Sequence, residues 1–422
     1  IEKWAFVPPP LLDKLRGVFN EKGDGEAIKG KTNSIYLADG SITLRDIYYG
    51  GKWRSTLIAG LGYGGKGLYA IDVTDPSNPE HLFSIKHDNT KRLVEYWDAD
   101  GTLTFYDYVV DASFPAALDY SKMGESWSRP FITLIPYDGA LKWVTVIGAG
   151  YSGVDGKEAG FGRFVYVLDL EPNAAQGDKI GTVLAKIELT EYAGSDVPNA
   201  AVAAISALTV DSASNADYYG NLIYIADLQG SVWKFDLAKN ELSDSDTTIF
   251  DVERHLNAES TLSNDRLMYH KPVVSFDGNT PQYFVGTGDM VRRDRLEGVI
   301  NNRIFAFKDH DFPLHANADS TIPFTMSDLA DASTSCATSE QKGWYQNLSS
   351  LLSPSLGAKV IGEAAMFSNS TDVYFSTYVP SSDMSCSAEG SSYLLTMDKS
   401  CGTETVAEIK IGDGLATTPV VY

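Results

Sequence analysis

The sequence predicts an all-β protein, a β-propeller of seven modified blades with long loop insertions. Three observations favour this fold: short runs of β-forming residues, a hairpin unit that recurs along the chain, and few helical patterns. Residues 1–422 are expected to form one propeller domain, because radial repetition lets a single unit grow beyond the usual domain size.

The recurring unit has the same order of elements each time. A run of β-forming residues often closes on glycine, a loop follows, and a second run ends near an aspartate. Two such runs joined by a glycine-bearing loop are typical of a β-hairpin. The unit occupies Lys52–Pro76, Lys142–Pro172, Asn221–Leu237, Gln282–Asp309 and Asp372–Asp398, and its closing aspartates are Asp72, Asp169, Asp236, Asp309 and Asp398. These hairpins define five clear blades, and two weaker ones complete the expected seven.

Shorter elements precede several hairpins and are expected to be the innermost strands. They lie at residues 126–139, 207–211 and 270–278, and ATTPVVY at 416–422 is expected to add another that closes the ring. A four-stranded meander repeated around an axis is a propeller blade. The pattern leaves one alternative open, which is two stacked β-sandwich domains.

Three segments fall outside the repeat. Residues 8–20 (PPPLLDKLRGVFN) are expected to hold a short helix. The polar, serine-rich residues 327–353 predict a long loop or insertion, and the aromatic-rich residues 86–119 predict an inserted hairpin.

Composition excludes some classes of partner. The net charge is −22, from 34 basic and 56 acidic residues. Because binding to nucleic acid needs clustered Lys and Arg, we expect no nucleic-acid partner. No stretch approaches the roughly 18 apolar residues of a membrane span, so none is expected. The acidity indicates either a soluble surface or carboxylates that hold calcium.

The chain has three cysteines and no zinc-binding CxxC pair. Cys386 and Cys401 flank one expected hairpin, and a bridge between them is one of two open alternatives. Cys336 would then be free or paired outside this chain.

Other motifs give little indication of catalysis. Asp98 and Asp100 lie in a DxDGT motif, but strand-like residues on both sides favour a hairpin turn over a phosphatase nucleophile. The glycine-rich run at 60–65 is not followed by a helix, which favours a turn over a phosphate loop. The histidines lack metal-binding spacing.

One loop has the composition of a cation site. Asp211, Asn215, Asp217 and Asn221 bring four oxygen-bearing side chains onto a short segment. Calcium prefers such oxygen ligands, completed by backbone carbonyls. The residues alone leave two interpretations open, a calcium site and a polar turn between strands.

Several segments match one known family, in the family's order. They are KWRSTLIAGLGYGGKGLYAIDVTDP (52–76), MGESWSRPFI (123–132), VIGAGYSG (146–153), IADLQGSVWKFDL (225–237), VGTGDM (285–290) and GSSYLLTMD (390–398). Through these the chain resembles the C-terminal propeller of the PilC/PilY family, the tip-associated proteins of bacterial type IV pili.

The resemblance implies the C-terminal part of a longer secreted protein, located at the pilus tip or outer membrane. It implies roles in pilus biogenesis, in opposing retraction during twitching motility, and in adhesion to host cells or surfaces during virulence. The implied partners are minor pilins or a tip complex and a surface receptor. The family's calcium loop implies ligands at Asp211 and Asn221, with Asn215 and Asp217 between them in a longer and less regular loop.

Two alternatives to this non-enzymatic role remain. The strands also look like those of quinone-dependent dehydrogenases, which share propeller architecture and bind quinone with calcium. A carbohydrate-binding propeller would use exposed Tyr and Trp as sugar platforms.

Overall fold

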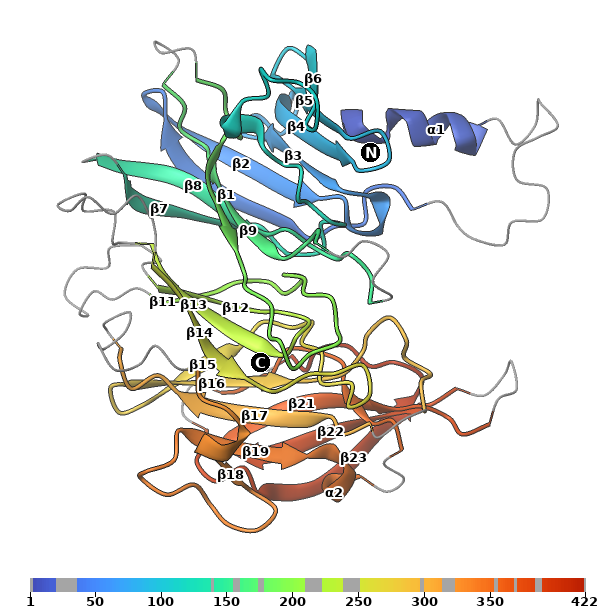
Figure 1. Cartoon of the computed structure of the whole chain (residues 1–422), viewed down its shortest axis with the longest axis vertical. Helices are drawn as coiled ribbons and strands as arrows, with labels where there is room; N and C mark the ends of the chain where they lie inside the picture. Colours follow the sequence, from blue (N-terminus) through green and yellow to red (C-terminus); the bar gives the residue numbers. More distant parts are fainter. Residues whose placement is uncertain are drawn as a thin grey trace.

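A computed structural model describes residues 3–19, 36–137, 140–154, 160–173, 178–208, 222–237, 251–296, 300–312, 323–352, 356–367, 370–383 and 389–420. In these residues the regular secondary structure is almost entirely β, arranged in five sheets that follow one another along the chain (Figure 1). The predicted all-β class is therefore confirmed.

Each sheet is a meander of antiparallel strands, with one parallel pair in the fourth. The first contains β1 (Ile42–Tyr49), β2 (Lys52–Gly60), β3 (Gly67–Asp72), β4 (Glu80–Asp88), β5 (Leu93–Trp97) and β6 (Leu103–Asp107). The second contains β7 (Phe131–Tyr137), β8 (Ala140–Gly148), β9 (Phe164–Asp169) and β10 (Val183–Glu188). The third contains β11 (Ser206–Leu208), β12 (Leu222–Ala226), β13 (Ser231–Asp236) and β14 (Asp251–Asn257).

The fourth sheet contains β15 (Val273–Asp277), β16 (Thr280–Gly286), β17 (Arg303–Lys308), β18 (Leu329–Asp331) and β19 (Gly343–Asn347), with β18 parallel to β19. The fifth contains β20 (Lys359–Val360), β21 (Asp372–Val379), β22 (Ser391–Asp398) and β23 (Glu404–Asp413). The helices are short: α1 (Leu12–Phe19), which follows the 3-10 turn η1 (Pro9–Leu11) as expected, and α2 (Leu348–Leu351).

All five predicted hairpins are present, and each supplies the second and third strands of its sheet in chain order. These pairs are β2–β3, β8–β9, β12–β13, β16–β17 and β21–β22. Every residue of β3, β9 and β12 is buried; the second sheet covers one face of β3 and the N-terminal segment covers the other. Strands buried on both faces need nearly continuous apolar runs, which these hairpins provide.

The described residues form five sheets, not the seven blades expected. The aromatic-rich segment forms the hairpin β5–β6, which widens the first sheet as predicted. Residues 327–353 were expected to be a long loop or insertion, and the interpretation as a loop is wrong. They form β18, β19 and α2, because the fully buried Trp344 anchors them on the fourth sheet despite their polar composition. Residues 416–420 are not a strand, and Thr417 and Thr418 bond to the fifth sheet instead.

Apolar clusters join successive sheets in chain order. One contains Ile58 of the first sheet and Ile147 of the second. A larger one continues through the third sheet into the fourth, and another joins Phe284 of the fourth to Val373 of the fifth. Leu11 and Phe6 of the N-terminal segment pack on Leu61 and Tyr69 of the first sheet region. The sheets therefore pack face to face with their neighbours, as propeller blades do.

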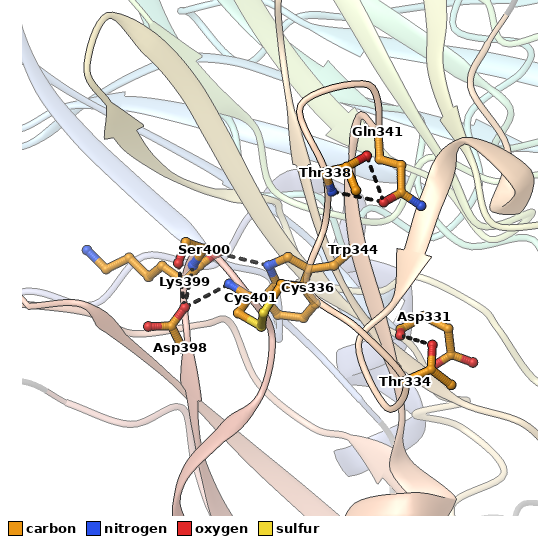
Figure 2. Close-up of a disulfide and its surroundings, with 10 residues drawn as sticks. All are labelled: Asp331, Thr334, Cys336, Thr338, Gln341, Trp344, Asp398, Lys399, Ser400 and Cys401. Carbon is orange, nitrogen blue, oxygen red and sulfur yellow. Dashed lines mark hydrogen bonds between the residues drawn. A yellow bond between two sulfur atoms is a disulfide. The ribbon is translucent and has the colours of Figure 1, made fainter.

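A disulfide links the last two sheets (Figure 2). It joins Cys336, in the connection between β18 and β19, to Cys401, in the turn after β22. Beside it, Trp344 Nε1 donates a 2.9 Å hydrogen bond to the carbonyl of Lys399. The expected Cys386–Cys401 bridge is therefore wrong. Cys386 lies outside the described residues.

Candidate functional site

The predicted calcium ligands lie outside the described residues. Asp211, Asn215, Asp217 and Asn221 belong to the connection between β11 and β12, whose ends are held together by the register pair Leu208 and Leu222. In the described parts of the chain, no three His, Cys, Asp or Glu side chains cluster as metal ligands. The calcium site therefore stays a prediction.

The DxDGT motif forms the turn between β5 and β6. The Asp98 carboxylate accepts hydrogen bonds from the backbone N–H groups of Asp100 and Thr102, and Gly101 has a φ of +77°. A left-handed residue of this kind is what a tight hairpin turn requires. The interpretation as a turn is confirmed, and the strands around it are antiparallel rather than the parallel strands of a phosphatase.

The innermost strands of four sheets surround a central cavity of about 570 Å³. Its walls come from the start of β1 and from the chain entering β7, β11 and β15. These segments belong to the first four sheets, so the cavity lies where their innermost segments meet.

Hydroxyl groups tie the walls of this cavity to one another. Each donates a hydrogen bond to a backbone carbonyl of the next sheet: Thr43 to Pro130 at 2.6 Å, Ser128 to Ala203 at 2.8 Å, and Ser206 to Pro272. Because a buried carbonyl is costly to leave unpaired, these bonds fix the spacing of the innermost segments.

Three charged side chains gather at the cavity. Arg129 enters from the second sheet and Lys271 from the fourth, and both line the cavity. Glu363, just after β20 of the fifth sheet, approaches both cations: its carboxylate lies 3.7 Å from the Arg129 guanidinium and 3.4 Å from the Lys271 ammonium. The three side chains are 44%, 26% and 29% exposed, so water and solutes reach them.

An aromatic cluster includes Trp127 and Tyr269, which precede Arg129 and Lys271 by two residues in the sequence. The rings of Trp127 and Tyr151 stack with centroids 4.2 Å apart and planes 14° from parallel. Tyr63, in the connection between β2 and β3, and Tyr269, just before β15, contact the same tryptophan, with ring centroids 4.5 Å and 6.3 Å from its own. Burial raises the pKa of Tyr151 and Tyr269 far above neutrality, so their hydroxyls stay protonated.

Sequence reasoning missed this group, although a signal was present. Residues 127–130 read WSRP and residues 269–272 read YHKP, so both follow the pattern aromatic-x-basic-Pro immediately before an innermost strand. The two aromatic rings meet each other, and the two cations meet Glu363. The repeated tetrapeptide therefore builds one site from two separate sheets.

Buried charges hold the Tyr269 side of the cluster. Asp265 and Asp289 are fully buried, and Lys359 lies 3.7 Å from the Asp265 carboxylate. Burial raises the pKa of Asp265; burial acts in the same direction on Asp289, but hydrogen bonds from Arg292 hold its pKa below the usual value. Tyr269 donates its hydroxyl to Asp289 at 3.3 Å, which fixes the ring.

Comparisons with known proteins point in one direction. A family model described as the PilY1 beta-propeller domain matches residues 11–99. The type IV pilus biogenesis factor PilY1 of Pseudomonas aeruginosa is 30% identical over 58% of this chain and 16% of that protein. A PilY1 homolog of Xylella fastidiosa is 24% identical over 97% of this chain and 25% of that protein.

The fold is matched as well. The crystal structure of the P. aeruginosa PilY1 C-terminal domain aligns with 96% of this chain and 76% of its own, with a TM-score of 0.62 and 21% identity. The chain spans a quarter or less of the length of these curated relatives. It is thus a homologue of the type IV pilus biogenesis factor PilY1, with the fold of the PilY1 C-terminal domain.

Proposed function

We propose that this chain is the propeller domain of a pilus-tip protein that acts in type IV pilus biogenesis by opposing retraction and that adheres to host cells or surfaces. The observation that carries the proposal is its similarity to PilY1 proteins, which extends over 97% of the chain for one relative and includes the fold. Its partners would be minor pilins or a tip complex, together with a surface receptor. No catalytic role is proposed, since the relatives are named as biogenesis factors.

One feature supports a location outside the cytoplasm. The Cys336–Cys401 disulfide is a type of bond that persists in oxidising compartments and is rare in the reducing cytosol. In the described residues, no helix is long and apolar enough to cross a membrane.

The test is to remove residues 36–420 from the full-length protein and to measure surface pilin, twitching and attachment. We expect fewer surface pili, and we expect piliation to return when the retraction motor is also deleted, because assembly itself would remain intact. Unchanged piliation, twitching and attachment would contradict the proposal. Restored piliation without restored attachment would separate adhesion from assembly.

We further propose that calcium binds at Asp211, Asn215, Asp217 and Asn221. The support is the oxygen-rich composition of the loop and its place between paired strand ends. Added calcium should raise the melting temperature of the chain, because a ligand that binds only the folded state stabilises it. Asp211→Ala should abolish the rise, whereas Asp100→Ala, in an ordinary turn, should keep it. A melting temperature insensitive to calcium would end the idea.

A further inference from the structure

We propose that the central cavity binds a carboxylate carried on a short apolar chain, with Arg129 and Lys271 as the cations that hold it. Glu363 is then the resident competitor, which occupies part of the same charge pair when the ligand is absent. The inference rests on the geometry of the cavity and is independent of the role in pilus biogenesis.

The first argument is that the cations have donors to spare. Arg129 carries five N–H donors and Lys271 three. Among the described residues, neither side chain makes a hydrogen bond, and Glu363 stands at ion-pair distances of 3.7 and 3.4 Å rather than in a close bidentate contact. A second carboxylate can therefore be bound without displacing an existing hydrogen bond.

The second argument is charge. Two cations face one carboxylate, so the group carries a net charge of +1 in a chain whose overall charge is −22. A local positive site in an acidic protein selects a small anion that can enter the cavity. Guanidinium and ammonium groups both bind carboxylates through short, charge-assisted hydrogen bonds.

The third argument is the rest of the lining. Apolar side chains line part of the wall beside the cations: Ile42 and Leu44 of β1, Phe131 of β7, and Val273 of β15. A volume of about 570 Å³ lies in the range of small-ligand sites. An apolar chain bearing one carboxylate matches both halves of this wall, whereas inorganic phosphate would bring two charges and leave the apolar surface uncovered.

The fourth argument is rigidity. Hydroxyl-to-carbonyl bonds fix the cavity walls, and the Trp127–Tyr269 contact holds together the two segments that carry the cations. A site whose donors are already in place loses little conformational entropy on binding.

The carboxylate could come from a free acid or from the end of a polypeptide, and the experiment separates these sources. Isothermal titration of the purified chain would use hexanoate, its neutral analogue hexanamide, a hexapeptide ending in leucine with a free or amidated carboxyl end, and inorganic phosphate. We expect hexanoate or the free peptide to bind at least about tenfold more tightly than its neutral counterpart. The neutral form cannot make the charge-assisted hydrogen bonds to Arg129 and Lys271. Tighter binding of hexanoate than of the free peptide would identify a free acid as the ligand, and tighter binding of the free peptide would identify the end of a polypeptide. Equal binding of acid and neutral forms, tighter binding of inorganic phosphate, or no heat from any probe would overturn the proposal.

Substitutions of the cations and of Glu363 should change the binding affinity in opposite directions. Arg129→Gln and Lys271→Met should each weaken binding of the better probe by about tenfold. Glu363→Gln should strengthen it several-fold, because the competing charge is gone while both cations remain. Arg92→Gln, which breaks an exposed pair with Asp107 on the β5–β6 hairpin, should leave binding unchanged. Melting temperatures verify folding, and weaker binding in Glu363→Gln would show that the triad is only structural and would sink the proposal.

Discussion

The aspartate that closes a hairpin unit is held inside its own sheet in two repeats and between two sheets in another. Asp72 pairs with Arg54 at 2.8 Å, and Asp169 pairs with Lys142 at 2.6 Å, each within one hairpin. Asp309, at the end of the fourth hairpin, pairs at 2.7 Å with Lys234 of β13 in the third sheet. The cations of the first two pairs keep 18% and 19% of their side chains exposed, whereas both members of the third are fully buried.

The difference shows that the closing aspartate stabilises a single sheet in two repeats and the contact between two sheets in another. Within a sheet, strands are already joined by backbone hydrogen bonds, so the ion pair adds little. Between sheets there is no backbone ladder, and Asp309 there also accepts a 2.5 Å hydrogen bond from Tyr224 of β12. Contacts between sheets should therefore dominate the response to mutation.

Among the predictions on stability, the largest loss is expected from breaking the buried ion pair between Lys234 and Asp309. Lys234→Met leaves the Asp309 carboxylate buried without its ammonium partner, and we expect a loss of about 3–5 kcal/mol in the free energy of unfolding. Chemical denaturation measures it. The double variant Lys234→Met with Asp309→Leu should recover much of the loss, because no unpaired charge remains. A loss below about 1 kcal/mol in the single variant would show that the pair does not join the sheets.

The disulfide is the second contact between sheets. Cys336→Ser should lower the free energy of unfolding by about 2–4 kcal/mol, because the bond closes a long loop and so restricts the unfolded chain. Cys386→Ser is the matched control and should change stability little. If Cys386→Ser were as costly as Cys336→Ser, the cysteine pairing would have to be reassigned.

Acid should weaken the contact between the third and fourth sheets. Burial alone would raise the pKa of Asp309, but the charges of His255 and Lys234 and hydrogen bonds from Lys234 and Tyr224 hold it below the usual value. A depressed folded-state pKa contributes stability above the unfolded value of about 3.9, and that stability is lost as pH falls through the folded value. The stability gap between the native chain and Asp309→Asn should therefore be widest near pH 7 and narrow below about pH 4. A gap that is constant from pH 7 to pH 3 would contradict this assignment.

The sequence was informative where structure is local and weak where it depends on packing between sheets. The five hairpins follow from β-forming runs and glycine turns, and all five are present. The innermost strand β20 has only two residues, too short to carry a pattern, and it was not predicted. Nothing near Asp309 in sequence indicates that its partner is Lys234.

The candidate site was likewise predictable in its local patterns and not in its packing between sheets. The two aromatic-x-basic-Pro tetrapeptides can be read in the sequence, because each is a local pattern before a strand. Their meeting with Glu363 cannot, since it depends on how the second, fourth and fifth sheets surround one axis. The disulfide partner of Cys401 was missed for the same reason.

The smallest effect should come from the pairs inside a sheet, and it completes the comparison. Lys142→Met removes the partner of Asp169, but that carboxylate also accepts a hydrogen bond from the backbone N–H of Glu171, and water reaches the ammonium site. We expect a loss of about 1 kcal/mol or less, as for other partly exposed ion pairs, and a similar value for Arg54→Met. Chemical denaturation under the conditions used for Lys234→Met allows the losses in the free energy of unfolding to be compared directly. If Lys142→Met cost as much as Lys234→Met, the location of a pair within or between sheets would not decide its contribution, and burial of the carboxylate alone would have to explain both.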